Sequence, residues 1–533
     1  MRKKNSSWKF TLLIILLLIE LGTTLCSVIG GDSSYDFLHY HLYNAFAFWE
    51  GRWYTDIIPA GIHTFFNPLL DVPLYLAVKY FNTTPLPLRI YHGLFYGLFI
   101  FFTLKIAQII FPGRKNIWFA ALATFIAVTG VATMEQLGMA FNEVTLAALL
   151  SASLYLMLAF FFTKRTVSSW FIVGSAFLAG ACCGLKYTAA PFVTGLMGIF
   201  FFNFLRKPAP IKNFILFALG GIGGFLVTNG YFMYHLWVQY KNPFFPFLNE
   251  FFKSPYYEPR NFGELKFCPA NWKELLLFPY SIAKEGWAAS EVPVAEPRFW
   301  FAYLATLPLL FFSAKKRHLQ QWQLRALTSV IIFIAAFYAL WLWHFCIWRY
   351  SIMLEVTSAL IIVAAISLIK WKHIRIGTMV VTFCYFLFSI SLPNWGRSYQ
   401  DHLVSLIPQP TVKENAIVLL FTTPAAFLAP FFPPSTTFIS GFNDVYKDMF
   451  FMVHLQTSRL YYAYHFEQQI ADRISHHQGP IYILSRESEQ FLYEPALEPF
   501  HLQVNPKECT YFSHFYYWED LYFLCELTPI VDN

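Results

Sequence analysis

Eleven runs of mostly apolar residues divide this chain, and most of them are long enough to cross a lipid bilayer. About 20 consecutive apolar residues, as a helix, cross a hydrocarbon core about 30 Å thick. We expect membrane spans at residues 10–28, 90–111, 117–134, 144–162, 168–185, 188–205, 213–237, 299–313, 326–345, 351–369 and 376–392. Only 13% of the residues are charged, against about 25% in soluble domains. The sequence therefore predicts an all-α polytopic membrane bundle, and it excludes a cytosolic enzyme or a nucleic-acid partner.

The basic residues lie mainly in alternate connections between these runs. About half of the 38 Lys and Arg residues fall in segments that share one side of the membrane with the N-terminus. The connection from Glu135 to Glu143, on the other side, has none. Because basic loops stay cytoplasmic, this alternation predicts the topology N-in/C-out. The first span is either an uncleaved anchor or a cleaved signal peptide. No A-x-A-like cleavage site precedes Gly30, which favours the anchor.

This topology places three long polar stretches outside the membrane. They are residues 29–89, residues 238–298 and the terminal stretch 393–533. The first two interrupt the apolar runs, whereas the third follows the last of them. We expect a transmembrane domain over residues 1–392 and a separate small domain over residues 393–533.

The pattern of the terminal stretch indicates an α/β domain outside the membrane. Short runs of β-branched and apolar residues predict strands at residues 416–421, 436–440 and 481–485. Helical spacing of apolar residues predicts a helix over residues 458–476.

Six of the eight cysteines fall into two groups. Four lie in or beside apolar spans, where we expect small packing residues: Cys182, Cys183, Cys346 and Cys384. Cys509 and Cys525 lie in the outside domain, where disulfides persist, so we predict a bridge between them. No Cys/His spacing is typical of a zinc site.

The first outside stretch carries the densest group of polar residues. Asp32 and Asp36 come directly after the first span, and the aromatic segment 37–49 is amphipathic and too short to cross the membrane. We expect this segment to lie in the membrane interface. Asp36 is either the N-cap of that helix or a carboxylate near an apolar surface that acts as a general base.

The sequence Asp36-Phe37-Leu38-His39-Tyr40 resembles the acidic motif in the first outside loop of GT-C superfamily glycosyltransferases. These multispanning enzymes take a sugar from a polyprenyl-phosphate donor, and they include protein O-mannosyltransferases and lipid A aminoarabinose transferases. Their motif reads Asp-Glu-x-Arg-Tyr or similar, whereas Phe37 and His39 occupy its second and basic positions here. The resemblance implies that Asp36 is the catalytic base, with Asp32 as the alternative, and that His39 and Tyr40 contact substrate.

Three later features fall where this resemblance places functional groups: Asn142-Glu143, Lys186 and Arg349-Tyr350. The resemblance implies that Asn142 and Glu143 bind acceptor, donor phosphate or, in some members, a divalent metal. It implies that Lys186 and Arg349 bind the lipid-linked phosphate. Each charged residue has a structural alternative: a helix cap for Glu143, an interfacial anchor for Lys186 and a rim ion pair for Arg349.

The resemblance covers residues 1–392 and implies that this part of the chain is a transmembrane GT-C-like catalytic domain. It implies an inverting glycosyltransferase that uses a polyprenyl-phosphate-linked sugar. The acceptor is a glycan, a lipid or a protein, and the site faces the periplasm from a bacterial inner membrane. The resemblance implies no definite cofactor, and it leaves open whether the enzyme uses a divalent metal. Two other functions fit part of the pattern: a transporter or flippase of lipid-linked sugars, which needs no base, and a non-catalytic membrane assembly protein.

Overall fold

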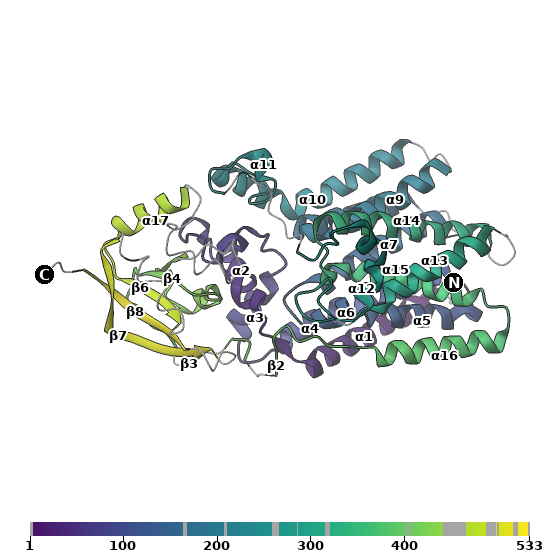
Figure 1. Cartoon of the computed structure of the whole chain (residues 1–533), viewed down its shortest axis with the longest axis horizontal. Helices are drawn as coiled ribbons and strands as arrows, with labels where there is room; N and C mark the ends of the chain where they lie inside the picture. The colour runs from purple at the N-terminus through teal and green to yellow at the C-terminus, as the bar shows by residue number, and fades with distance from the viewer. Residues whose placement is uncertain are drawn as a thin grey trace. The chain divides into compact units, whose positions relative to one another are not determined.

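The computed structural model describes residues 4–163, 168–206, 211–257, 259, 266–284, 286–314, 320–399, 402–404, 406–407, 409–440, 465–486, 497, 500–514 and 521–530. The chain forms two compact units (Figure 1). The first comprises Met1–Ile29, Arg89–Gly230 and Gly263–Trp395, and the second comprises Gly30–Leu88, Tyr231–Phe262 and Gly396–Asn533. The domain boundary predicted between residues 392 and 393 stays a prediction.

Helices make up most of the chain before residue 390. Their bounds are α1 Lys4–Ile29, α2 Leu42–Trp49, α3 Val72–Phe81, α4 Leu86–Ile110, α5 Ile117–Val128, α6 Val131–Gln136, α7 Glu143–Phe162, α8 Trp170–Leu185, α9 Ala190–Arg206, α10 Ile211–Tyr240, α11 Asn249–Phe252, α12 Trp272–Ala283, α13 Pro297–Ala314, α14 Gln321–His344, α15 Ile352–Ser367 and α16 Lys372–Phe388. Each predicted span overlaps at least one of these helices, which confirms the helical membrane bundle.

Fewer of the described helices have the length and composition of a membrane span than the sequence predicts. Within the described residues, seven helices are long and apolar enough to cross a membrane: Trp8–Ile29, Leu86–Ile110, Glu143–Phe162, Tyr187–Arg206, Ile211–Tyr240, Gln321–His344 and Trp348–Ser367. The predicted count of eleven is therefore not confirmed. One reason is visible in the run 117–134, which breaks into α5 and the short helix α6.

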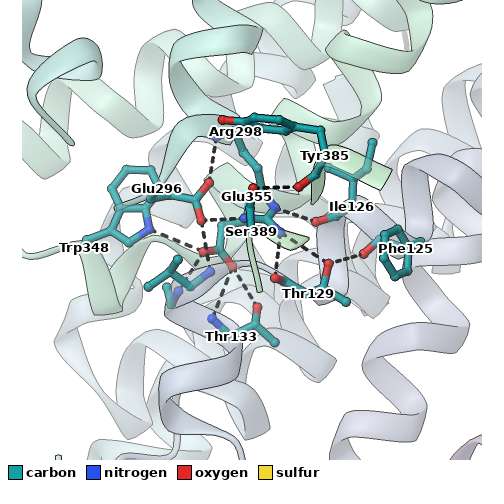
Figure 2. A network of polar contacts seen from close by, with 12 residues as sticks. Phe125, Ile126, Thr129, Thr133, Glu296, Arg298, Trp348, Glu355, Tyr385 and Ser389 are labelled. Atoms are coloured by element: carbon teal, nitrogen blue, oxygen red, sulfur yellow. Dashed lines mark hydrogen bonds and ion pairs between the residues drawn. The ribbon is translucent and has the colours of Figure 1, made fainter. Parts of the chain in front are cut away.

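Two buried carboxylates hold the start of α6 in place (Figure 2). Glu355 on α15 accepts hydrogen bonds from the backbone N–H of Ala132 at 2.7 Å and of Thr133 at 3.2 Å. Glu296, just before α13, accepts one from the N–H of Val131 at 3.0 Å. The first N–H groups of a helix have no partner within the helix, so these carboxylates replace the missing acceptors.

Arg298 connects one of these carboxylates to the end of α5 (Figure 2). Its guanidinium donates to the Glu296 carboxylate at 2.8 Å, to the carbonyl oxygen of Ile126 at 2.8 Å and to that of Thr129 at 2.6 Å. Arg298 and Glu296 are both fully buried. A buried ion pair is stable only when its remaining hydrogen-bonding groups also find partners, and the α5 carbonyls supply them.

The second unit contains a six-stranded sheet in the order β3-β7-β8-β6-β4-β5 (Figure 1). The strands are β3 Leu406–Ile407, β4 Ile417–Leu420, β5 Thr437–Ser440, β6 Ile481–Arg486, β7 Leu502–His514 and β8 Tyr522–Pro529. Strands β5, β4 and β6 pair in parallel, and the other pairs are antiparallel. The three predicted strands are β4, β5 and β6, whereas β7 and β8 were not predicted.

Helix α17, His465–Ser475, covers part of this sheet. Its apolar residues Phe466, Ile470 and Ile474 join the buried core formed with β4 and β6. The predicted helix over 458–476 is confirmed for this stretch, and residues 458–464 lie outside the described part of the chain. The predicted α/β class of the terminal domain is confirmed by this mixed sheet and its helix.

The first outside stretch extends the edge of this sheet. Ile57 pairs in parallel with β5, donating to the carbonyl oxygen of Phe438 at 2.9 Å and accepting from the N–H of Ser440 at 3.0 Å. The buried ion pair of Arg52 and Asp56, with N–O distances of 2.6 and 2.8 Å, fixes the turn before it. Residues of the first stretch and of the terminal region therefore form one unit.

Two disulfides are present in the described residues. Cys509 and Cys525 form the predicted bridge, between neighbouring residues of β7 and β8. The prediction that Cys346 is a packing residue of a span is wrong, because Cys346 is bonded to Cys268. Cys346 follows the end of α14, so it lies in the connection to α15 and meets another connection.

Candidate functional site

Lys186 and Glu143 form an ion pair between two helices of the first unit. Lys186 follows the last residue of α8, and Glu143 is the first residue of α7. The Lys186 ammonium binds the Glu143 carboxylate and donates to the carbonyl oxygen of Phe141 at 2.8 Å. Their side chains are 21% and 6% exposed, so a half-buried cation faces a buried carboxylate.

Asn142 sets the direction in which Glu143 enters this pair. Its backbone is left-handed, with φ of 66°, a conformation that Asn tolerates better than most residues. Its side-chain amide donates to the carbonyl oxygen of Ala140 at 2.8 Å. Glu143 also lies in the first turn of α7, where the helix dipole favours a negative charge. Its favourable position at the start of the helix and its ion pair with Lys186 therefore coexist.

Arg349 and Tyr350 bring a second cation to the same place. The Arg349 guanidinium donates to the Tyr350 hydroxyl at 3.0 Å and lies 3.5 Å from the carboxylate of Glu291. Arg349 lies 5.1 Å from the centroid of the Tyr350 ring, and the Lys186 nitrogen lies 5.7 Å from that centroid. Both cations therefore meet at one aromatic ring, within the range of cation–π attraction.

A buried carboxyl group, Glu135, completes this cluster. The indole N–H of Trp395 donates to it at 3.3 Å, and Arg349 lies 5.2 Å from the Trp395 ring. Burial raises the pKa of Glu135 to about 8, although the charge of Arg349 acts in the opposite direction. Gln136, the next residue of α6, donates to the backbone carbonyl of Arg349 at 2.8 Å.

Sequence reasoning missed Glu135, Glu291 and Trp395. Glu135 is an acidic residue directly after the apolar run 117–134. The connection that it begins contributed to the predicted topology through its lack of cations, and not through this carboxyl group. Ionisable residues at the ends of spans are frequently functional, which would have drawn attention to it. Glu291 and Trp395 carry no such local signal, because only folding brings them to Arg349.

An apolar cleft lies beside the ion pair in the first unit. It encloses about 340 Å³ of empty space, open solvent included. Its lining residues are Glu143, Leu146, Ala147, Leu150, Thr188, Ala189, Phe192, Phe337, Tyr350, Ile352 and Met353. Only Glu143, Thr188 and Tyr350 are polar, and most of the others come from α7, α9, α14 and α15. We call this space the Glu143 cleft.

The other predicted residues lie in the second unit. Asp36 precedes a π-helical turn, Phe37–His41, and within the described part of the chain its carboxylate makes no capping hydrogen bond. The Tyr40 hydroxyl lies 3.5 Å from it. Asp32 accepts a hydrogen bond from the N–H of Ser34 at 2.7 Å. Asp36 thus occupies the N-cap position of this turn without a capping hydrogen bond from its side chain.

Rings surround the predicted substrate residues His39 and Tyr40. His39 is buried, stacks on Tyr35 with ring centroids 4.9 Å apart and meets His63 at 5.3 Å. Tyr40 stacks on His63 at 5.0 Å. Phe37 to Ala47 are all buried, whereas Trp49 at the end of the predicted segment is 48% exposed. The expected place of this segment in the membrane interface stays a prediction. π-Helical turns occur frequently at functional sites.

The structure thus gathers the predicted residues into two groups. Asn142, Glu143, Lys186, Arg349 and Tyr350 form one group in the first unit, and Asp32, Asp36, His39 and Tyr40 lie in the second. Among the described residues, no group of three or more His, Cys, Asp or Glu side chains has the arrangement of a metal site. The open question of a divalent metal stays a prediction.

Comparison with known proteins finds similarity in structure alone. No protein-family model matches the chain, and no curated protein matches it. The crystal structure of ArnT from Cupriavidus metallidurans in the apo state matches with a TM-score of 0.53 and 12% identity, over 97% of this chain and 98% of that chain. This chain has an ArnT-like fold.

This match, over nearly the whole of both chains, confirms the predicted fold class of a helical membrane bundle with a small terminal α/β domain. The crystal structure of the same ArnT bound to undecaprenyl phosphate matches with a TM-score of 0.43 and 16% identity. That match covers 71% of this chain and 63% of that chain.

Proposed function

We propose that this protein is a membrane glycosyltransferase that takes a sugar from a polyprenyl-phosphate donor. The observation that supports this most directly is the meeting of Lys186 and Arg349 at the Tyr350 ring, which lines the Glu143 cleft. A lipid phosphate needs an apolar space for its chain and cations for its head group. ArnT, which has the same fold, has been crystallised with undecaprenyl phosphate.

In this proposal the two cations bind the phosphate and stabilise the charge that grows on it as the sugar leaves. Arg349 offers a fork of N–H donors and Lys186 a compact charge. Glu143 and Glu291 hold these side chains in place before the donor binds. Cations that are already oriented cost no reorganisation during the reaction, which is the basis of electrostatic stabilisation in enzymes.

The acceptor hydroxyl loses its proton to Asp36 and attacks the anomeric carbon from the face opposite the phosphate, so the configuration inverts. Asp32 is the alternative base. His39, Tyr40 and Asn142 are proposed to position substrate. We place the reaction on the periplasmic face of a bacterial inner membrane, with a pentose or hexose as the sugar and a glycan, lipid or protein as the acceptor.

The donor site is tested by binding. We expect the protein in lipid nanodiscs to bind undecaprenyl phosphate, measured by native mass spectrometry. Arg349→Gln and the double variant Lys186→Met/Glu143→Gln, which leaves no unpaired charge, should each weaken binding about 10- to 100-fold, the effect of losing a hydrogen bond to a charged group. Lys372→Ala, an exposed lysine of α16, is the control. Unchanged affinity in both site variants would contradict the donor site.

The base is tested by turnover. Asp36→Asn should keep the affinity for undecaprenyl phosphate and abolish the release of this lipid from undecaprenyl-phosphate-linked pentoses and hexoses. Asp32→Asn should show which carboxylate matters. A flippase would still move the labelled lipid across a vesicle membrane when Asp36 is Asn, so retained activity of that kind would favour the transporter alternative.

A further inference from the structure

A larger cleft lies entirely within the second unit, apart from the residues discussed above. It encloses about 1310 Å³ of empty space, open solvent included. Its walls come from the stretch 53–58, the end of α10, Tyr256 and helix α17 with the two histidines that follow it. We call it the α17 cleft. Among the residues predicted or proposed to act on substrate, none lines it.

One wall of the α17 cleft is a polar helix face. Gln469, Asp472, Arg473 and His476 line the cleft, and their spacing of three and four residues puts them on one face of a helix. The residues Ile470 and Ile474 turn instead to the buried core of the sheet. The core therefore fixes the rotation of α17 and directs these polar side chains to the cleft.

A second part of the lining is aromatic. It includes Trp53, Tyr54, Tyr240 and Tyr256. Tyr54 is 68% exposed, whereas Trp53 is held at its ring by His235, with centroids 3.8 Å apart. Tyr240 and Tyr256 pack edge to face at 5.1 Å. The cleft thus presents firmly positioned rings to whatever enters it.

Two buried side-chain atoms in this region have no hydrogen-bond partner among the described residues. The side-chain oxygen of Gln239 and the Nε2 atom of His477 are buried, and neither has a hydrogen-bond partner among the residues that the structure describes. Both residues line the α17 cleft. A buried polar group without a partner costs about 1–3 kcal/mol, so hydroxyl donors of a bound molecule would be favourable here.

We propose that the α17 cleft binds a saccharide. The C–H face of a sugar ring is weakly positive and packs on the negative face of aromatic rings, and its hydroxyls match amide, carboxylate and imidazole groups. Of the charged lining residues, Asp472 is offset by Arg473, and Asp56 is paired with Arg52 behind the cleft. The lining is therefore near neutral, which suits a sugar better than a polyanion. The proposal does not depend on transferase activity, because binding needs no turnover.

The test is a screen of neutral, amino and acidic oligosaccharides on an array, using full-length protein in nanodiscs prepared without glycoside detergents. The oligosaccharide bound most strongly is then titrated by calorimetry. Tyr54→Ala and Asp472→Asn should each weaken its binding at least about fivefold, the loss of one good contact. Both residues are exposed, so their replacement should leave the thermal unfolding temperature unchanged.

Two controls separate the cleft from the rest of the surface. Gln468 is exposed and adjacent to Gln469 but does not line the cleft, so Gln469→Ala should weaken binding and Gln468→Ala should not. Tyr511→Ala, on β7 and 48% exposed, should also bind normally. The proposal is overturned if no oligosaccharide binds, or if cleft and control variants bind alike. Because undecaprenyl-phosphate binding is measured separately, failure here leaves the donor site standing.

Discussion

The carboxylate of Glu355 is the best place to test the architecture of the first unit. It is fully buried on α15 and accepts the N–H groups of Ala132 and Thr133, one on each oxygen, together with the Thr133 hydroxyl at 2.8 Å. In Glu355→Gln the shape is kept, but one oxygen becomes an amide NH2, which cannot accept. At least one backbone N–H at the start of α6 is then buried without an acceptor.

The expected loss follows from these contacts. An unsatisfied buried donor costs about 1–3 kcal/mol, and the backbone N–H and the hydroxyl of Thr133 donate to the same oxygen of Glu355. We expect Glu355→Gln to destabilise the first unit by about 3 kcal/mol. At roughly 2–4 °C for each kcal/mol in larger domains, the unfolding temperature should fall by roughly 6–12 °C.

The assay is thermal unfolding of the purified protein in one detergent. Gly130→Ala probes the same contact from the other side, because an added Cβ would lie 2.0 Å from the Glu355 carboxyl carbon, and it should destabilise at least as much. Glu414→Gln, an exposed carboxylate of the second unit, is the control. If Glu355→Gln unfolds within about 1 °C of the unchanged protein, the two-carboxylate clamp on α6 is wrong.

Two further predictions concern ionisable side chains. Burial raises the pKa of Glu135 from 4.5 to about 8, so between these pH values the native state keeps a proton that the unfolded chain has lost. The contribution of this group to the free energy of unfolding is complete below pH about 4.5 and is lost as the pH rises to about 8. Glu135→Gln should therefore unfold at a higher temperature than the unchanged protein at pH 8 and show less pH dependence, and parallel curves would contradict this. Arg52 donates twice to Asp56 and once to the carbonyl oxygen of Pro434, at 3.0 Å. A lysine cannot reproduce this fork, so Arg52→Lys should cost about 2–3 kcal/mol and speed proteolysis around residues 53–55; an unchanged cleavage rate would argue against it.

Much of the secondary structure follows from local pattern. The apolar runs are helices because a helix satisfies its own backbone in a membrane, and the runs at 416–421 and 481–485 became the central strands β4 and β6. Strands β7 and β8 were not predicted because they are rich in aromatic and polar residues. Strand β7, whose outer edge pairs only with the short strand β3, also shows no clean alternation of polar and apolar residues. The break after Val128 could not be found from hydropathy, since α5 and α6 read as one apolar run.

The functional residues divide in a similar way. Topology placed Glu143, Lys186 and Arg349 on one side of the membrane, and the structure brings them together at Tyr350. The predicted topology did not indicate the hydrogen bond between Glu135 and Trp395, because these residues are 260 positions apart in the chain. Asp36 was predicted as a helix cap or a base, and only the structure shows that it precedes a π-helical turn without a capping hydrogen bond from its side chain.

The sequence by itself determined that the chain is a membrane protein, which segments are helical and which cysteines of the terminal domain are bonded. These properties depend on residues close in sequence, or on a composition that averages over the whole chain. Only the tertiary structure decided that Glu296, Arg298 and Glu355 clamp a short helix, that two cations share one ring, and that α17 faces a cleft. Such contacts join residues that are far apart in the chain, and their energy depends on burial and on partners that no local pattern specifies.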